Sequence, residues 1–166
     1  MLEASAGKCV TMVNGDLRSA PSHSLSLDLH VHWYKHGDEK DWLMIHEKAD
    51  VYNEITPQLF SDQFGDSTLA LSERQFYLLD TTGSAIATGT AWAASHGKFL
   101  GFGRPHWLAV LPRFQRHGVG TMLMSIIWKR LLELGHTSAF LTTSTSRPRA
   151  IRLFEKFGFR IVKAEE

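Results

Sequence analysis

The chain has 166 residues, which is enough for one compact domain with a sizeable core. Its composition is that of a soluble globular protein and not of a disordered chain, with 43% hydrophobic and 21% charged residues. The formal net charge of +1 gives no electrostatic argument for binding to nucleic acid or to an anionic membrane, and we expect neither partner.

The sequence contains a single cysteine, Cys9, so no internal disulfide can form and a reducing, intracellular setting is favoured. Cys9 lies near the chain end, away from any recognisable site pattern, and we do not expect it to be catalytic. The chain has no run of about 18 apolar residues, the length needed to span a bilayer, and its N-terminus lacks the apolar centre of a signal peptide. These features predict a cytoplasmic protein.

The first 24 residues show no periodicity and are predicted to form an irregular leader or an irregular first strand, with a single domain over residues 25–166. Apolar and polar side chains then alternate over residues 25–33, which predicts a strand with one buried face. The apolar members of this alternation are Leu25, Leu27, Leu29, Val31 and Trp33.

Two helices are predicted to follow this strand. Asp38 is the expected N-cap of the first, which has an apolar stripe. The second begins with Thr56 as N-cap and Pro57 as first helical residue, and it ends at Gly65. The stripe of the first helix consists of Trp42, Ile45, Ala49 and Tyr52.

Residues 74–111 have the pattern of three strands joined by short turns, an antiparallel meander. A long apolar helix is predicted over residues 119–134, then a strand over 137–143, a helix over 148–157 and a last strand from Phe159. This order of elements predicts an α/β (α+β) fold with a central mixed, mostly antiparallel sheet flanked by helices.

Two glycines, Gly118 and Gly120, stand where the third strand of the meander gives way to the long helix. The first turn of a helix exposes backbone N–H groups at the positive end of the helix dipole, and glycine lets a phosphate approach them closely. The loop therefore predicts a diphosphate site, with a plain strand-to-helix turn as the alternative. The side chains that can add donors are Gln115, Arg116, His117 and Thr121.

The segment WLAVLPRFQRHGVGTMLM resembles the acyl-CoA-binding motif of the GNAT (N-acetyltransferase) superfamily, whose loop reads Gln/Arg-x-x-Gly-x-Gly/Ala. Gln115, Gly118 and Gly120 match this loop. The later segment RAIRLFEKFGFR resembles the second signature of the family, Ala-x-x-Leu-Tyr-x-Lys-x-Gly-Phe, and the two occur in family order. The residues that match the second signature are Ala150, Leu153, Lys156, Gly158 and Phe159.

The resemblance, which covers residues 104–160, implies a GNAT-like fold in which the strand that ends near residue 110 splays away from the strand over 137–143. The pantetheine arm of acetyl-CoA, the co-substrate, would enter this gap, and an acceptor amine would attack the thioester directly. Arg147 stands where the family often has an asparagine that touches pantetheine. The cofactor residues implied in this way are Leu108, Ala109, Val110, Gln115, Arg116, His117, Gly118, Val119, Gly120, Thr121 and Arg147.

His106 is the candidate general base, because it lies on the strand that leads into the loop and histidine has a suitable pKa; a structural strand histidine is the alternative. Phe154 stands where the family usually has a tyrosine that protonates the departing thiolate, so no general acid is assigned. Aromatic residues in the acceptor region are predicted to line the substrate pocket, with core packing as the alternative: Trp33, Tyr34 and Trp42.

Three polar residues on one strand face, Asp28, His30 and His32, with His36 nearby, raise the alternative of a metal site; outward-facing polar side chains are the simpler interpretation, and no metal is predicted. The rival functions are a non-catalytic acyl-CoA-binding or regulatory module and a nucleotide-binding protein of another kind. The acceptor stays open among a protein N-terminus, a lysine, an amino acid, a polyamine and an aminoglycoside. Members of the family are often dimeric, which leaves a homodimer open.

Overall fold

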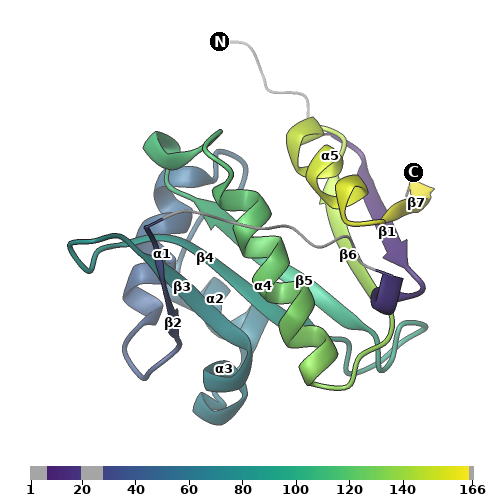
Figure 1. Cartoon of the computed structure of the whole chain (residues 1–166), viewed down its shortest axis with the longest axis horizontal. Helices are drawn as coiled ribbons and strands as arrows, with labels where there is room; N and C mark the ends of the chain where they lie inside the picture. Colours follow the sequence, from purple (N-terminus) through teal and green to yellow (C-terminus); the bar gives the residue numbers. More distant parts are fainter. Residues whose placement is uncertain (1–6, 20–27, 165–166) are drawn as a thin grey trace.

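Seven strands form one sheet in the computed structural model, which describes residues 7–19 and 28–164 (Figure 1). The strand order is β2-β3-β4-β5-β6-β1-β7, and all neighbours are antiparallel except β5 and β6, which are parallel. The predicted mixed, mostly antiparallel sheet is therefore confirmed. The strands are β1 (Cys9–Asn14), β2 (His30–Trp33), β3 (Gln75–Leu79), β4 (Ala85–Ala93), β5 (Gly103–Val110), β6 (Ala139–Ser144) and β7 (Arg160–Ala164).

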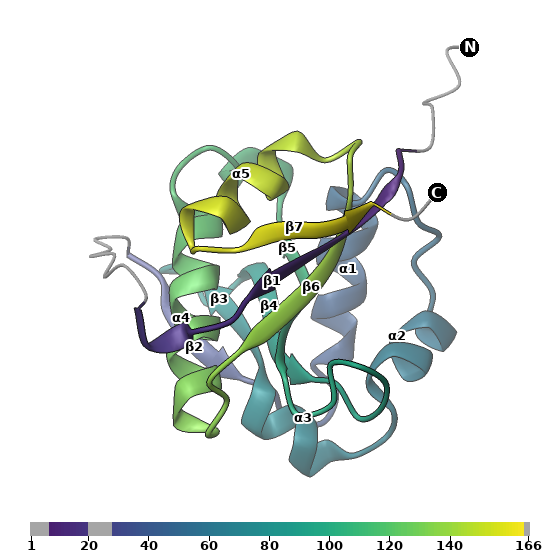
Figure 2. The ribbon, with the colours of Figure 1, turned by 90° about the vertical axis from the view of Figure 1, so that its right-hand side faces the viewer.

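Helices cover both faces of the sheet, with α4 on one face of β4 and β5 and α1 on the other face (Figure 2). The apolar side of α4, including Leu123, Ile127 and Leu131, is buried as its spacing predicts. The helices are α1 (Glu39–Ala49), α2 (Pro57–Phe64), α3 (Thr68–Arg74), α4 (Val119–Glu133) and α5 (Pro148–Lys156). Within the described ranges, no helix has the length and apolar character that crossing a membrane requires.

The predicted helix ends of α2 are confirmed. The Thr56 hydroxyl accepts a hydrogen bond from the Leu59 N–H, Pro57 is the first helical residue, and Gly65 ends the helix with a φ of 70°. Asp38 is the N-cap residue of α1, as predicted, but its side chain makes no capping hydrogen bond. Its carboxylate instead accepts the backbone N–H of Lys35 at 2.7 Å and lies 2.8 Å from His32 Nε2, because the chain turns there before the helix begins.

Strand β2 is shorter than the predicted strand over residues 25–33, of which Leu25 and Leu27 lie outside the described residues. Trp33 packs against Phe76 of β3, with ring centroids 5.3 Å apart. Val31 is 41% exposed, although the alternation assigns it to the buried face. β2 is the edge strand of the sheet, where one face is only partly covered.

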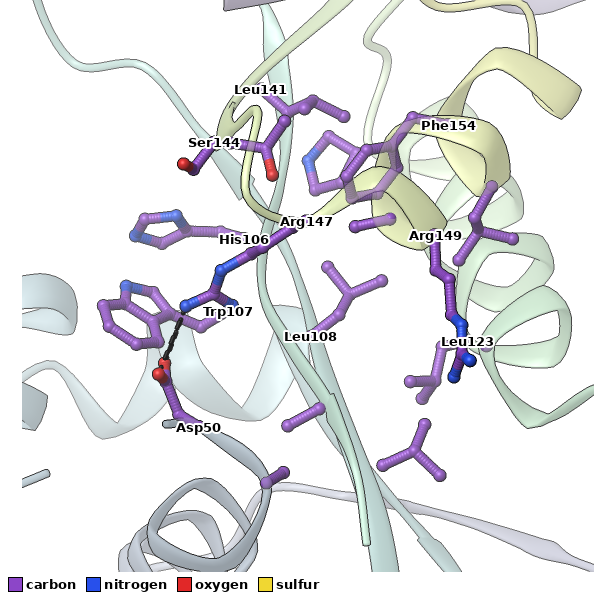
Figure 3. A pocket seen from close by; sticks show the side chains of 18 of the residues that line it. Asp50, His106, Trp107, Leu108, Leu123, Leu141, Ser144, Arg147, Arg149 and Phe154 are labelled. Atoms are coloured by element: carbon purple, nitrogen blue, oxygen red, sulfur yellow. Dashed lines mark hydrogen bonds and ion pairs between the residues drawn. The ribbon is translucent and has the colours of Figure 1, made fainter. Parts of the chain in front are cut away.

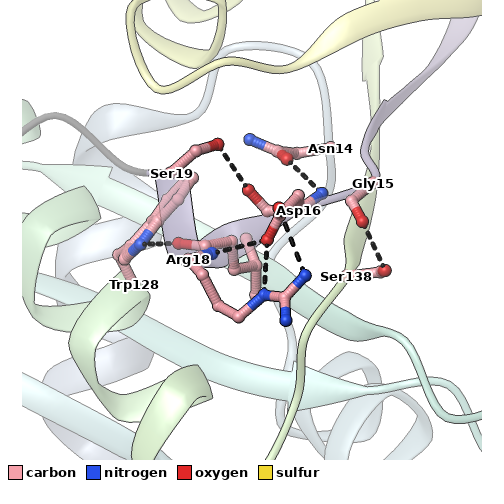
Figure 4. A network of polar contacts seen from close by, with 8 residues as sticks. Asn14, Gly15, Asp16, Arg18, Ser19, Trp128 and Ser138 are labelled. Atoms are coloured by element: carbon pink, nitrogen blue, oxygen red, sulfur yellow. Dashed lines mark hydrogen bonds and ion pairs between the residues drawn. The ribbon is translucent and has the colours of Figure 1, made fainter.

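Of the two interpretations of the N-terminal residues, an irregular leader or an irregular first strand, the second describes residues 9–14. They form β1, which pairs with β6 on one side and with β7 on the other, with a register shift between Thr11 and Met12. The short 3-10 turn that follows is tied to α4, because Trp128 Nε1 donates to the Leu17 carbonyl at 2.8 Å (Figure 4). Asn14 Nδ2 likewise donates to the Phe157 carbonyl at 3.0 Å. Consecutive residues of β1 are buried, so the period-two pattern that reveals a strand is absent.

The parallel strands β5 and β6 separate almost at once. They pair at one position, Gly103 opposite Ala139, where the Gly103 N–H donates to the Ser138 carbonyl at 2.9 Å. A Cβ atom at Gly103 would lie 2.7 Å from Leu131 of α4, so a larger residue here would require the Leu131 side chain to shift. Beyond this point the backbone edge of β5 that faces β6 has no strand partner in the described structure.

Candidate functional site

A cavity of about 830 Å³ opens where β5 and β6 part (Figure 3). Its walls come from both strands, the loop before α4, the start of α5 and the segment that follows α1. Most of the residues predicted for the site from the sequence line this one cavity: His106, Leu108, Ala109, Val110, Gln115, Arg116, Gly118, Gly120, Thr121 and Arg147.

The remaining predicted residues do not line it. The side chain of Val119 is buried in the core, and His117 is exposed to solvent. The aromatic residues assigned to the acceptor pocket are also outside the lining, so their alternative, core packing, describes them better: Trp33, Tyr34 and Trp42. The aromatic residue that does reach the cavity from this side is Trp107, whose ring packs edge-on against Trp42 with centroids 5.4 Å apart.

The glycine loop leaves backbone amides free at one end of the cavity. Gly118 has a φ of 81° and Arg116 a φ of 65°, both in the left-handed region, and the first bond of α4 runs from the Met122 N–H to the Gly118 carbonyl. The N–H groups of residues 119–121 have no acceptor in the parts of the chain that the structure describes. Free amides at a helix N-terminus form an anion-binding site.

Basic side chains surround these amides. Arg116 and Arg149 line the cavity, and Lys156 Nζ lies 3.4 Å from Thr121 Oγ1 in the first turn of α4. A positive helix terminus with three cationic side chains nearby favours a group with more than one negative charge. The Gln115 side chain fixes the loop to the sheet, since its Nε2 donates to the Val110 carbonyl at 3.0 Å.

The cavity wall between the sheet and helices α4 and α5 is apolar. Phe154, 8% exposed, lies in this wall at the position where the resemblance leads one to expect a tyrosine (Figure 3). A phenyl ring has no proton to give, so this wall supplies no general acid. The apolar side chains in the wall are Leu108, Leu123, Leu141, Leu153 and Phe154.

A β-bulge distorts β5 in the middle of the cavity. The pairs Thr88–Ala109 and Thr90–His106 leave a single residue of β4 opposite two residues of β5, Trp107 and its neighbour. Trp107 has a φ of 49°, an outlier for a bulky residue that costs about 1–3 kcal/mol. The strain is held by a hydrogen bond from Trp107 Nε1 to Gln63 Oε1 at 2.9 Å. Such bulges and strained residues concentrate at functional sites.

Gln63 also fixes the tautomer of His106. The indole N–H can only donate, so the Gln63 atom it meets is the carbonyl oxygen, and His106 Nε2, 3.1 Å from the same oxygen, must carry a proton. Burial, with the charge of Arg104 and the neighbouring His46, lowers the pKa of His106 to about 3. An imidazole with this pKa is neutral at pH 7 and is a weak base, which weighs against the predicted role.

His46 and Asp50 are among the site residues that were not found from the sequence. His46 lines the cavity, is 2% exposed, and its Nε2 has no partner in the described structure; burial lowers its pKa to about 4. Asp50 lies four residues later, just past the end of α1. A spacing of four residues places His46 and Asp50 on the same side of a helix, and this spacing is the sequence feature that could have indicated them.

Arg147 was predicted to contact the cofactor, but its guanidinium points toward Asp50 (Figure 3). Nη2 donates to both carboxylate oxygens at 3.2 Å, linking the start of α5 to the segment after α1. Burial raises the pKa of Asp50, but hydrogen bonds from Asn53 and Tyr52 and the charge of Arg147 outweigh it, and the pKa lies below its usual range. The ion pair closes one side of the cavity.

The metal alternative at Asp28, His30, His32 and His36 has no support in the geometry. His32 is engaged by Asp38, as described above. Over residues 7–19 and 28–164 there is no group of three or more His, Cys, Asp or Glu side chains that could hold a metal ion.

A glycine loop at a helix start, beside two parallel strands that splay apart, is the arrangement of an acyl-CoA-dependent N-acetyltransferase fold. The family model described as the acetyltransferase (GNAT) family matches residues 40–159. The chain belongs to this family, and the resemblance seen in the two sequence motifs is confirmed.

Solved structures show the same fold. A GCN5-related N-acetyltransferase from Sphaerobacter thermophilus superposes with a TM-score of 0.76 at 16% identity, over 94% of this chain. The chain spans about half the length of that protein, 49%. The ribosomal-protein-S18-alanine N-acetyltransferase from Escherichia coli has a TM-score of 0.65 at 22% identity, covering 80% of this chain and 77% of its own.

A GCN5-related N-acetyltransferase from Kribbella flavida gives a TM-score of 0.63 at 14% identity, covering 82% of this chain and 84% of its own. The comparison with curated proteins gives no significant match to the sequence. At these identities the structural likeness concerns the fold, and the chemistry must be argued from the residues of the cavity.

Proposed function

We propose that the protein transfers an acetyl group from acetyl-CoA to a primary amine, by direct attack of the amine in a ternary complex. The proposal rests on the family and on one observation, the continuous cavity that runs from the free amides of the α4 start to the bulge at Trp107. Its anion-binding, apolar and strained parts follow one another in the order of the diphosphate, pantetheine and thioester groups of acetyl-CoA.

Acetyl-CoA would be held by backbone more than by side chains. The diphosphate would accept hydrogen bonds from the amides of residues 119–121, with Arg116 and Lys156 supplying countercharge. The pantetheine arm would lie between the unpaired edge of β5 and the apolar wall that contains Phe154. The thioester carbonyl would then lie near the bulge at Trp107, where a backbone N–H can stabilise the developing oxyanion.

The residues that line the cavity include no strong base that could take the proton from the amine. His46 and His106 are both neutral at pH 7 and weakly basic, with pKa values lowered to about 4 and about 3. The attacking amine would lose its proton to water in the cavity, and solvent would protonate the thiolate because Phe154 carries no hydroxyl. Coenzyme A thiolate leaves without an acid in this scheme.

The pH dependence of the reaction follows from these two histidines. Neither changes its charge between pH 5.5 and 9, so kcat/KM should rise about tenfold per pH unit until the pKa of the free amine is reached. Initial rates of thiol release across this range provide the measurement. A plateau that begins near pH 6.5 would instead identify a histidine as the base and contradict this scheme.

The direct test of the proposal is calorimetric titration with acetyl-CoA, followed by a screen of primary amines for acceptor-dependent thiol release. We expect binding at micromolar concentrations and release of thiol with at least one amine class. No heat of binding at high micromolar acetyl-CoA would reject the cofactor, and competition by ATP or ADP at equal concentration would favour a nucleotide site.

A second candidate function is a non-catalytic acyl-CoA-binding or regulatory module. The observation in its favour is that the cavity has neither a phenol at position 154 nor a strong base. Tight binding of acetyl-CoA without thiol release for any amine would support it. The cytoplasmic location and the homodimer stay predictions.

A further inference from the structure

Arg104, the second residue of β5, lies in the cavity without an acidic partner. It forms no ion pair in the described structure, and its single side-chain hydrogen bond runs from Nη2 to the Thr142 hydroxyl at 3.1 Å. Its Nε is buried and has no hydrogen-bond partner, and its Nη1 makes no hydrogen bond in the described structure, while the residue lines the cavity. Burial alone accounts for the lowered pKa of this guanidinium.

The nearby charges do not compensate this cation. Asp50 is the one carboxylate in the cavity lining, and both of its oxygens are taken by Arg147. His46 and His106 are neutral at pH 7 because burial lowers their pKa values. Two arginines and one aspartate therefore leave this side of the cavity with one uncompensated positive charge, an arrangement that a bound anion would stabilise.

The guanidinium lies at the level of the bulge and not at the diphosphate loop. Gly103 is level with Ala139, so in these parallel strands Thr142, which binds the Arg104 head, is level with His106. Val110, beside the loop, is four residues further along β5, or about 13 Å. Arg104 is thus remote from the site argued for the diphosphate and adjacent to the site argued for the thioester.

We propose that the acceptor is an α-amino acid whose carboxylate binds Arg104, with its amine directed at the thioester near Trp107. The inference rests on the proposed acetyl transfer and names its substrate class. One carboxylate neutralises one guanidinium, whereas a phosphate dianion would leave a buried negative charge. In an α-amino acid the amine and the carboxylate are about 3 Å apart. A carboxylate bound by Arg104, which is level with the bulge, therefore leaves the amine close to the site argued for the thioester.

A purely structural role for Arg104 is the main alternative. Its head lies over the Phe140 ring, 5.1 Å from the centroid, and its bond to Thr142 joins β5 to β6. A side chain that only links the strands would affect every acceptor equally. A side chain that binds the carboxylate discriminates between an amino acid and its amide, which have nearly the same size. Because the amine pKa is lower in the amide, kcat/KM is compared per concentration of free amine.

The experiment compares the twenty amino acids with their α-amides as acceptors, by thiol release from acetyl-CoA, in the unmodified protein, Arg104→Gln and Arg104→Lys. Arg152→Gln is the matched control, because Arg152 is exposed on α5 and does not line the cavity. Calorimetry with acetyl-CoA and thermal melting are recorded for each variant, and binding of the same acids and amides to the coenzyme A complex is measured in parallel.

We expect at least one amino acid to be preferred over its amide by roughly 10- to 100-fold in kcat/KM, or in affinity where turnover is absent. Arg104→Gln should lose this preference by reducing activity with the acid alone, Arg104→Lys should keep part of it, and Arg152→Gln should keep all of it. Equal use of acid and amide, no amino acid bound or acetylated while acetyl-CoA binds, or equal losses for both in Arg104→Gln would overturn the inference. Absence of acetyl-CoA binding in the unmodified protein would instead reject the proposed acetyl transfer itself.

Discussion

Replacing Gly118 by glutamate is expected to weaken acetyl-CoA binding by about 100-fold or more, because it places a carboxylate beside the amides argued to hold the diphosphate. Loss of one charged hydrogen bond costs about 1.5–3 kcal/mol, and like-charge repulsion adds to this. The fold should survive. A Cβ at Gly118 has no heavy atom within 4 Å, so the structural cost is the left-handed φ of 81°, about 1–2 kcal/mol.

The matched control is Gly118→Asn, since asparagine tolerates the left-handed region and carries no charge. It should bind acetyl-CoA within about tenfold of the unmodified protein, a factor set by the added bulk alone. Calorimetry for affinity and thermal melting for stability are measured on both variants. If Gly118→Glu bound acetyl-CoA as the unmodified protein does, the diphosphate would have to lie elsewhere.

The parts of the fold that could be predicted from the sequence are those fixed by local chemistry. The ends of α2 are set by local features. The Thr56 hydroxyl accepts a hydrogen bond from the first turn, the Pro57 ring fits the first helical position, and Gly65 ends the helix with a positive φ. The meander β3–β4–β5 follows in the same way from its apolar runs and turns. The glycine loop also depends on local geometry, which is why its position before α4 was predictable.

The parts that were missed depend on distant partners. β1 is buried among strands from the other end of the chain, so its own pattern carries no period. Asp50 and Arg147 are 97 residues apart, and nothing near either indicates the other. Arg147 stands at a position that binds the cofactor in the family, but in this structure its guanidinium is oriented by its ion pair with Asp50. Trp42 was assigned to a pocket by its type, whereas two helices and the bulged strand enclose it.

Strain at Trp107 was equally out of reach of the sequence. A bulge arises when one strand has one residue more than its partner between two fixed pairs. Here the shorter strand contributes Gly89 alone. A Cβ atom at Gly89 would lie 3.1 Å from Ile127 and 3.3 Å from Phe76. A larger residue at Gly89 would therefore displace the ends of the Ile127 and Phe76 side chains by a few tenths of an ångström, and the opposite strand carries the extra residue of the bulge.

Acid is expected to destabilise this protein strongly through the same two histidines that give the cavity its weak basicity. An unfolded chain protonates histidine near pH 6.5, whereas His46 and His106 in the folded protein resist protonation until about pH 4 and about pH 3. Between these values the unfolded state binds more protons than the folded state, so the free energy of unfolding falls as the pH falls. Each histidine should contribute a loss of about 3 kcal/mol by pH 4, which is a large share of a typical stability of about 5–15 kcal/mol.

His46→Phe isolates one of these contributions, because it retains a ring against Trp42, whose centroid lies 4.2 Å from that of His46, and removes the titrating group. Urea unfolding of the unmodified protein at pH 7 and pH 4.5 should give a fall in the free energy of unfolding that is about 2.4 kcal/mol larger than the fall in the variant. His117→Phe is the control for the change from histidine to phenylalanine, since His117 is exposed to solvent. An identical pH dependence in His46→Phe and the unmodified protein would mean that His46 takes up its proton near pH 6.5 in the folded protein as in the unfolded chain, and that burial does not keep it neutral at pH 4.5.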